Sequence, residues 1–180
     1  MPCRADPGRT VIARAQTTGP LVRATPWVST AVRLLLAGVF LTAGGIKAVD
    51  PQTSVSAVRA YELLPAGLVT PVGWGLPFAE IALGLLLVVG AFTRVLAVVS
   101  AVLLLVFIAG ALSAAARGLS IDCGCFGGGG PVTAGQTAYA REVVRDAVLV
   151  LLAGWLIWRP HSRLALEPLS LGRPDPEGAR

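Results

Sequence analysis

The sequence predicts an all-α integral membrane protein, a bundle of four transmembrane helices. Of its 180 residues, 54% are hydrophobic and only 14% are charged, whereas about a quarter of a soluble domain is charged. The apolar residues form long continuous runs, and a helix needs roughly 20 such residues to cross a bilayer. Because the runs do not alternate with polar residues, they indicate helices rather than barrel strands. The lipid bilayer is therefore the first partner that the sequence implies.

The order of the runs defines the expected organisation of the chain. We expect spans at residues 27–48, 71–92, 95–115 and 140–158. The second and third spans are joined by a tight turn at Thr93-Arg94, and a short interfacial helix is expected at Val55–Leu64. Residues 1–26 are predicted to form a disordered basic arm, and residues 159–180 a flexible cytoplasmic tail.

The distribution of charge predicts the orientation and excludes one class of partner. The net charge is +5, but most basic residues lie at the ends of apolar runs, which does not fit a nucleic-acid surface. With four spans, ten of the 15 basic residues fall on the side of the two termini and five on the other side. The positive-inside rule then places both termini in the cytoplasm of a cell (plasma) membrane, and the 117–135 loop outside it.

The extracytoplasmic loop carries the motif with the clearest chemistry, Asp-Cys-Gly-Cys-Phe-Gly at 122–127. Disulfides form and persist outside the cytoplasm. Cys123 and Cys125 can reach bonding distance in a turn, which Gly124 permits. The resulting ring is small and strained, and strained exposed disulfides are the labile ones, whereas a staple gains more from a long loop. The spacing favours Cys123 and Cys125 as a redox pair.

Other interpretations of the cysteines stay open at this point. The pair could be reduced and inert beside Phe126, or it could bind a soft ion such as Cu(I). Two sulfurs make a weak site, and His161 is expected on the opposite side, so we predict no metal. Cys3, in the N-terminal arm, is interpreted as a bystander. No cofactor is evident from the residues, although a quinone is not excluded.

Four ionisable residues are expected near the cysteine pair, namely Lys47, Glu80, Arg145 and Asp146. A cation there would lower a thiol pKa, and a carboxylate would move protons during exchange. Each residue also has a structural interpretation. Glu80 could complement the helix dipole after Pro77.

The structural interpretation is preferred for the cations near the ends of the first span and for the charged residues at the start of the last span. We interpret Arg33 and Lys47 as anchors that extend to the headgroups. The charged residues of 141–146 are interpreted as an interfacial face of the last span.

The motif and several other segments resemble those of a known family, the methylamine utilisation protein MauE family within the DoxX-like membrane proteins. The resemblance covers about residues 28–158. Besides the cysteine motif, it rests on Ala-Gly-Gly-Ile-Lys at 43–47 with Asp50-Pro51, Tyr-Glu-Leu-Leu-Pro at 61–65, Glu80 with Gly84, and Arg145-Asp146.

The resemblance implies a four-helix membrane protein that takes part in extracytoplasmic redox maturation. MauE is linked to the disulfide-rich small subunit of methylamine dehydrogenase and to a thioredoxin-like partner. The resemblance implies Cys123 and Cys125 as the redox pair. Methylamine itself is not carried over, because nothing in the chain is expected to recognise it. The N-terminal arm is not part of the family pattern.

The favoured hypothesis is a membrane thiol–disulfide redox protein that exchanges with a thioredoxin-like partner. Whether it is itself an oxidoreductase or an accessory to one is left open. Two alternatives remain: a non-enzymatic assembly subunit with structural cysteines, and a small transporter that uses Glu80. A self-contained quinone-linked oxidase would need a second cysteine pair as a relay, which favours a partner protein.

Overall fold

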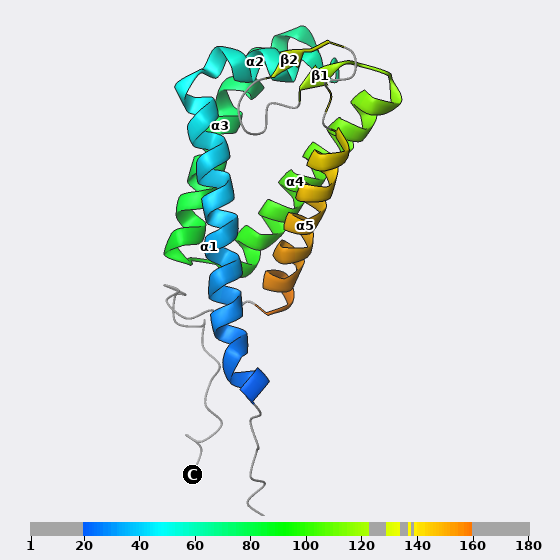
Figure 1. Cartoon of the computed structure of the whole chain (residues 1–180). Helices are drawn as coiled ribbons and strands as arrows, with labels where there is room; N and C mark the ends of the chain where they lie inside the picture. The colour runs from blue at the N-terminus through cyan, green and yellow to red at the C-terminus, as the bar shows by residue number, and fades with distance from the viewer. Residues whose placement is uncertain (1–19, 123–128, 134–136, 138, 160–180) are drawn as a thin grey trace, which may run out of the picture.

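The fold was examined in a computed structural model, which describes residues 20–122, 129–133, 137 and 139–159. The described part is mostly helical, as predicted, with one short pair of strands (Figure 1). The elements in chain order are α1 (Pro20–Val49), α2 (Pro51–Ala60), α3 (Ala66–Val89), α4 (Thr93–Ala116), β1 (Ile121–Asp122), β2 (Gly130–Pro131) and α5 (Tyr139–Trp158).

Three of the four predicted spans are long and apolar enough to cross a membrane. They are Thr25–Val49, Ala66–Val89 and Thr93–Ala116, with mean hydropathies of 1.7, 2.0 and 3.0. The fourth, α5, has 20 residues and packs along α4. Charged residues at 141, 142, 145 and 146 lie in its first turns and lower its apolar character. The predicted all-α bundle is therefore confirmed, with α5 as its most polar long helix.

The helix boundaries differ from the predicted ones at three places. Helix α1 begins at Pro20, so the end of the segment predicted as a disordered arm is helical. Helix α3 begins at Ala66 and contains Pro71 in its early turns. The tight turn lies at 90–92 rather than at Thr93-Arg94, because Gly90 ends α3 in a left-handed conformation with φ 72°.

Helix α2 begins earlier than the expected Val55–Leu64 segment because of its capping residues. The Asp50 side chain accepts hydrogen bonds from the Thr53 backbone N–H and hydroxyl group. Pro51 follows at the first helical position, where it removes no intrahelical bond. These bonds lower the pKa of the Asp50 carboxyl. Helix α2 packs against α3, and it crosses one end of the bundle in Figure 1.

The four long helices form two pairs, α1 with α3 and α4 with α5. Glycines allow the first pair to approach closely, because a Cβ at Gly44 would lie 2.8 Å from the Pro77 carbonyl oxygen and one at Gly84 would lie 2.7 Å from Leu41. The pairs meet near the 90–92 turn and diverge toward α2 (Figure 1). We call these ends the turn end and the α2 end.

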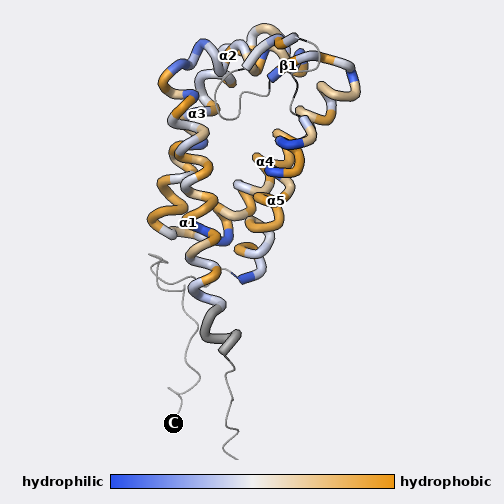
Figure 2. The backbone as a smooth tube through the Cα atoms, viewed as in Figure 1, coloured by the Kyte–Doolittle hydropathy of each residue, from blue (hydrophilic) through white to orange (hydrophobic). Residues whose placement is uncertain are grey.

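The long helices consist of apolar residues over most of their length (Figure 2). The exposed side chains there include Leu85, Val95, Val106, Val148 and Leu151. The strands β1 and β2 pair in antiparallel fashion at the α2 end, with Ile121 opposite Pro131 and Asp122 opposite Gly130. They pack against α2.

Candidate functional site

A buried ion pair joins the first two long helices near the α2 end. Lys47, in the last turn of α1, lies with its Nζ atom 2.5 Å from Oε1 of Glu80 in α3. The two side chains are only 7% and 1% exposed. Each charge would be costly at this depth without the other, so the pair allows both residues to be buried.

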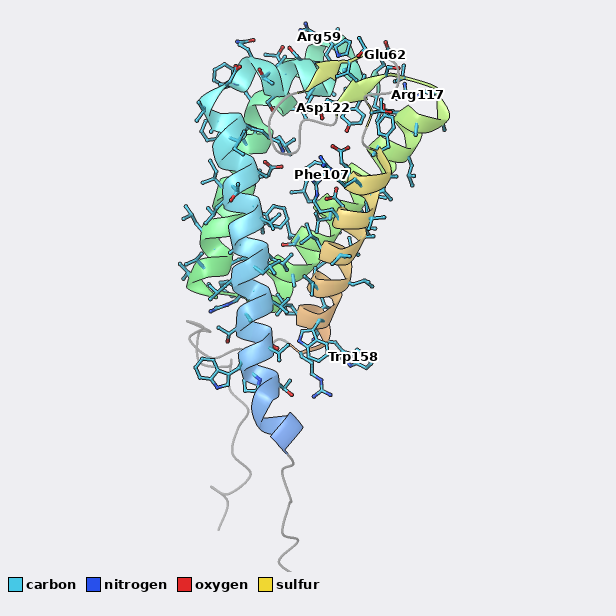
Figure 3. All side chains as sticks on the ribbon, in the orientation of Figure 1. Arg59, Glu62, Phe107, Arg117, Asp122 and Trp158 are labelled. Atoms are coloured by element: carbon cyan, nitrogen blue, oxygen red, sulfur yellow. The ribbon has the colours of Figure 1, made fainter. Side chains whose placement is uncertain are left out.

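The pair also contacts α4 through an aromatic ring. The Lys47 Nζ atom lies 5.3 Å from the centre of the Phe107 ring, which is within the range of a cation–π interaction. Figure 3 shows Phe107 in the space between the two helix pairs. Lys47 therefore links three helices at this level.

A second ion pair approaches the same region from α5. Arg145 Nε lies 2.9 Å from Oδ1 of Asp146. Both residues line a small cavity of about 20 Å³ together with Glu80, Phe107 and apolar side chains of α1 and α4. The predicted supporting residues Lys47, Glu80, Arg145 and Asp146 therefore lie around one region of the bundle.

Three of the structural interpretations made from the sequence were wrong. Lys47 and Arg33 do not extend to the headgroups, because their side chains are buried within the bundle, 7% and 1% exposed. Glu80 does not lie at a helix start, because α3 begins 14 residues earlier at Ala66. The 141–146 segment is not simply an interfacial face, because Glu142 and Asp146 are buried.

A larger cavity of about 240 Å³ opens beside the Lys47–Glu80 pair. It lies between α2, the loop that follows it, the first half of α3 and the second half of α4. Its lining is apolar except for Lys47, Ser54 and Tyr61. The remaining lining residues are Ala57, Val58, Leu63, Leu64, Val72, Leu76, Leu103, Val106, Phe107 and Gly110.

The strand pair fixes the two ends of the predicted redox loop. Cys123 and Cys125 lie outside the described residues, as do Cys3 and His161. Asp122, which precedes the cysteines, pairs with Gly130 in the ladder. The Tyr139 hydroxyl group donates to the Leu119 carbonyl and accepts from the Ile121 N–H.

Gly129, the first described residue after the cysteines, packs directly on α2. A Cβ there would lie 2.6 Å from the Ala57 Cβ and 3.3 Å from the Thr53 carbonyl oxygen. Its φ of +120° also favours glycine. The described residues on either side of the 123–128 segment are therefore both held at the α2 end.

Comparison with known proteins identifies a family. The family model for the methylamine utilisation protein MauE matches residues 25–159, which run from the early part of α1 through α5. This chain belongs to the MauE family. A curated MauE family protein, the methylamine utilization protein MauE of Paracoccus denitrificans, is 33% identical over 129 residues, covering 71% of this chain and 69% of the relative. No solved structure matches the chain.

The MauE family match confirms the resemblance predicted from the sequence and includes the cysteine motif within its bounds. It also includes every residue that forms the ion pairs and the large cavity. In the part of the chain that the structure describes, no group of three or more His, Cys, Asp or Glu side chains is placed to hold a metal ion.

Sequence reasoning missed the cavity and two of its residues, Ser54 and Phe107. Ser54 lies one residue before the short helix that was expected, and Phe107 is one of many apolar residues in the third span. Nothing in their local sequence distinguishes them. The wide separation of α3 from α4 at the α2 end creates the cavity, and this depends on packing over the whole bundle.

Proposed function

We propose that this MauE family protein is a membrane thiol–disulfide redox protein that acts through Cys123 and Cys125. Membership of the family suggests a role in methylamine utilisation. Within that role, the protein would exchange disulfides with a thioredoxin-like extracytoplasmic protein during maturation of other proteins. The termini would be cytoplasmic and the cysteine loop extracytoplasmic, in the cell (plasma) membrane.

The observation that carries this proposal is the anchoring of both ends of the Cys-Gly-Cys segment. The β1–β2 ladder joins residues 122 and 130, and Gly129 packs on Ala57. The described residues that flank the two cysteines are thus held together on a packed support, and this supports the proposed use of the cysteines as a pair. The end of α5 lies beside an early turn of α1 at the opposite end of the bundle, where the Ser29 hydroxyl group donates to the Arg159 carbonyl.

The exchange would proceed by thiolate attack on a disulfide sulfur. One cysteine thiolate attacks the partner's disulfide, a mixed disulfide forms, and one partner thiolate leaves. The second cysteine then attacks the mixed disulfide and releases the other partner thiolate. The pair ends as a disulfide and the partner as a dithiol, and the reverse sequence transfers two electrons the other way.

The buried charges are proposed to support this chemistry rather than to perform it. The Lys47–Glu80 pair fixes α1 against α3 directly below α2, and Arg145 and Asp146 fix the start of α5. Glu80 is paired with Lys47, and the transporter alternative, which uses this carboxylate, stays a separate prediction.

Trapping of the mixed disulfide tests the proposal. The chain has three cysteines, so Cys3→Ser combined with Cys125→Ala leaves only Cys123, and Cys3→Ser with Cys123→Ala leaves only Cys125. We expect one of these variants to form an adduct with an extracytoplasmic protein that a reducing agent releases. If neither does, thiol exchange is excluded.

Two further measurements test the sidedness and the assembly alternative. In intact reduced cells of the Cys3→Ser variant, a membrane-impermeant maleimide should label the pair, and labelling only after lysis would contradict the orientation. If Cys123→Ser with Cys125→Ser leaves the pathway fully active, the cysteines are structural and the chain is an assembly subunit.

A further inference from the structure

The large cavity at the α2 end opens on the side of the bundle, between two helices that are able to span the membrane. Leu63, Val72 and Val106 line it and are 53%, 38% and 59% exposed. Val72 belongs to α3 and Val106 to α4, and both helices are apolar enough to cross a bilayer. The open side of the cavity therefore faces the hydrocarbon of the membrane.

The position of the cavity along α4 places it within one leaflet. Its wall includes α4 residues from Leu103 to Gly110, and Leu103 lies beside the middle of this helix, which extends from Thr93 to Ala116. When the middle of α4 lies at the bilayer midplane, Arg117 lies about 21 Å farther along the axis, at about 1.5 Å per residue. Half a bilayer with its headgroups is about 20–22 Å thick. The cavity thus lies in the hydrocarbon of one leaflet, and Arg117 lies at its headgroup level.

Arg117 lies at the outer end of the cavity, on the cavity side of α4. Leu103, Gly110 and Arg117 follow each other at intervals of seven residues, so they share one helix face. The Arg117 Nη2 atom donates to the carbonyl oxygen of Tyr61, a residue that lines the cavity beside Gly110. The Nε atom donates to the Ser113 carbonyl oxygen. These two bonds hold the guanidinium group at the end of the cavity.

The guanidinium group keeps its charge and most of its donors for a ligand. Of its five N–H groups, the two bonds to carbonyl oxygens use two. Within the part of the chain that the structure describes, the ion pairs are those of Lys47 with Glu80 and Arg145 with Asp146, and Arg117 belongs to neither. A phosphate group matches the fork of donors that arginine presents. An anionic ligand would neutralise the charge, whereas a zwitterionic one would bring a cation of its own.

The size and the wall of the cavity exclude protein occupants. Its volume of about 240 Å³ is too small for a helix, which is about 10–12 Å wide with its side chains. An extended peptide would leave backbone N–H and C=O groups without partners against an apolar wall. A hydrocarbon chain has no such groups, and it is the material that surrounds the opening. The only charged group in the wall, Lys47, is already paired with Glu80.

We infer that the cavity holds an acyl chain of an anionic phospholipid whose phosphate group binds Arg117. The chain lies against the apolar residues of α3 and α4, and the headgroup lies where α4 ends, so a single lipid molecule satisfies both features. Bound in this way, the lipid fills the space between α3 and α4 at the α2 end. The inference does not depend on the chemistry of the cysteines.

Native mass spectrometry of the full purified chain in detergent tests the inference, with dioleoylphosphatidylglycerol as the probe. We expect one saturable adduct, and dioleoylphosphatidylcholine should bind about fivefold more weakly, because it carries no net negative charge. Glycerol phosphate carries the headgroup chemistry without the chains, and dioleoylglycerol carries the chains without the phosphate. Neither should displace the phospholipid at equal concentration.

The headgroup contact is tested with two arginines at opposite ends of α4. Arg117→Gln should weaken binding of phosphatidylglycerol by about fivefold or more and remove most of its advantage over phosphatidylcholine. The matched control is Arg94→Gln, in the first turn of α4 at the turn end and also exposed. It should leave the binding of both lipids unchanged.

The chain site is tested with two glycines. Gly110→Leu should weaken binding of both lipids by about tenfold or more, because the new side chain extends into the cavity beside Tyr61, 3.4 Å from its Cβ position. Gly154→Leu on α5, where a Cβ meets nothing within 4 Å, should change neither. Leucine is a better helix former than glycine, and circular dichroism checks the fold. If Gly110→Leu does not fold, the two arginine variants decide.

Four outcomes would overturn the inference. They are the absence of a saturable adduct, equal effects of Arg117→Gln and Arg94→Gln, equal effects of the two leucine variants when both fold, and displacement of the phospholipid by a competitor. Displacement by glycerol phosphate would indicate a site for free phosphate, and displacement by dioleoylglycerol would indicate a chain site that ignores the headgroup. A dimer that excludes lipid would assign the surface to a second copy of the chain and would also overturn the inference.

Discussion

The two ends of the bundle are built differently, although the same four helices form both. At the turn end the helix pairs converge on a packed apolar core, where Leu36, Leu87, Ala97, Ala153 and Leu156 are at most 1% exposed. At the α2 end the pairs diverge and enclose ion pairs and a cavity of about 240 Å³. Figure 3 shows that charged residues also gather on the outer surface of that end, with Arg59, Glu62, Arg117 and Asp122 labelled there.

The connections between helices explain this difference. A three-residue turn at 90–92 forces α3 and α4 together at one end. At the other end, α2 and the loops separate the same helices, because longer connections allow wider spacing. The tightly packed core that stabilises the bundle therefore lies at the turn end, and the cavity and the ion pairs lie at the α2 end. Four experiments test this division.

The largest expected effect comes from breaking the buried ion pair. Lys47→Met leaves the Glu80 carboxylate without its partner, and we expect a loss of about 3–5 kcal/mol in the free energy of unfolding. Adding Glu80→Leu to this variant should restore most of the loss, because no buried charge then remains. Denaturant titration of the purified protein in detergent measures both, and a double variant no more stable than Lys47→Met would contradict the assignment.

The next comparison sets the packed end against the hollow end within α3. Leu87→Ala, at a fully buried site, should cost about 2–4 kcal/mol because it creates a new cavity. Leu76→Ala, at the wall of the existing cavity, should cost about half as much, because fewer contacts are lost. Thermal unfolding of the two variants measures the contrast. Equal losses would show that the α2 end is as tightly packed as the turn end.

A third pair of variants tests the anchoring of the cysteine loop on α2. Gly129 and Gly130 share a φ of +120°, but only at Gly129 does a Cβ meet neighbouring atoms. Gly129→Ala should therefore cost about 1–3 kcal/mol more than Gly130→Ala, the difference being overpacking against Ala57. It should also change the rate at which a maleimide labels Cys123. Identical labelling in both variants would mean that the contact does not position the loop.

The smallest effect is expected at the exposed cap of α2. The hydrogen bonds from Thr53 lower the pKa of Asp50. A lowered pKa means that the stabilisation is present above the unfolded-state pKa, near 3.8, and is lost as the pH falls through the lower folded-state value. Amide exchange in the first turn of α2, corrected for intrinsic rates, should therefore rise at acidic pH. Asp50→Asn should remove this pH dependence, and a variant that retains it would assign the effect to another group.

The sequence alone allowed much of the fold to be predicted, because each span is an uninterrupted apolar run. The errors at the helix boundaries have local causes in the sequence, and these could have been used to predict the boundaries correctly. Asp50-Pro51 is a capping residue followed by a first-turn proline, which predicts the start of α2. Gly90 followed by Phe92 and Thr93 predicts a helix end three residues earlier than expected.

The site was less predictable, because it depends on which helix faces meet. Hydropathy places Lys47 and Glu80 at depth, but it does not show that they face each other. The glycines give a usable signal, because Gly44 lies three residues before Lys47 and Gly84 lies four after Glu80, which puts each glycine on the face of its charge. No such signal in the sequence marks the cavity or Ser54, because the cavity forms where the helices do not pack against each other.

The Lys47–Glu80 pair has a consequence for how the protein is made. The two residues are 33 positions apart, so α1 is synthesised and offered to the membrane before Glu80 exists as its counterion. A lone charge at the centre of a membrane helix costs about 2.5–3.5 kcal/mol during insertion, and the residue to which this applies is Glu80, well inside α3, rather than Lys47, in the last turn of α1. The order of synthesis therefore suits the pair, because Lys47 is already available as a counterion when α3 brings Glu80 into the membrane.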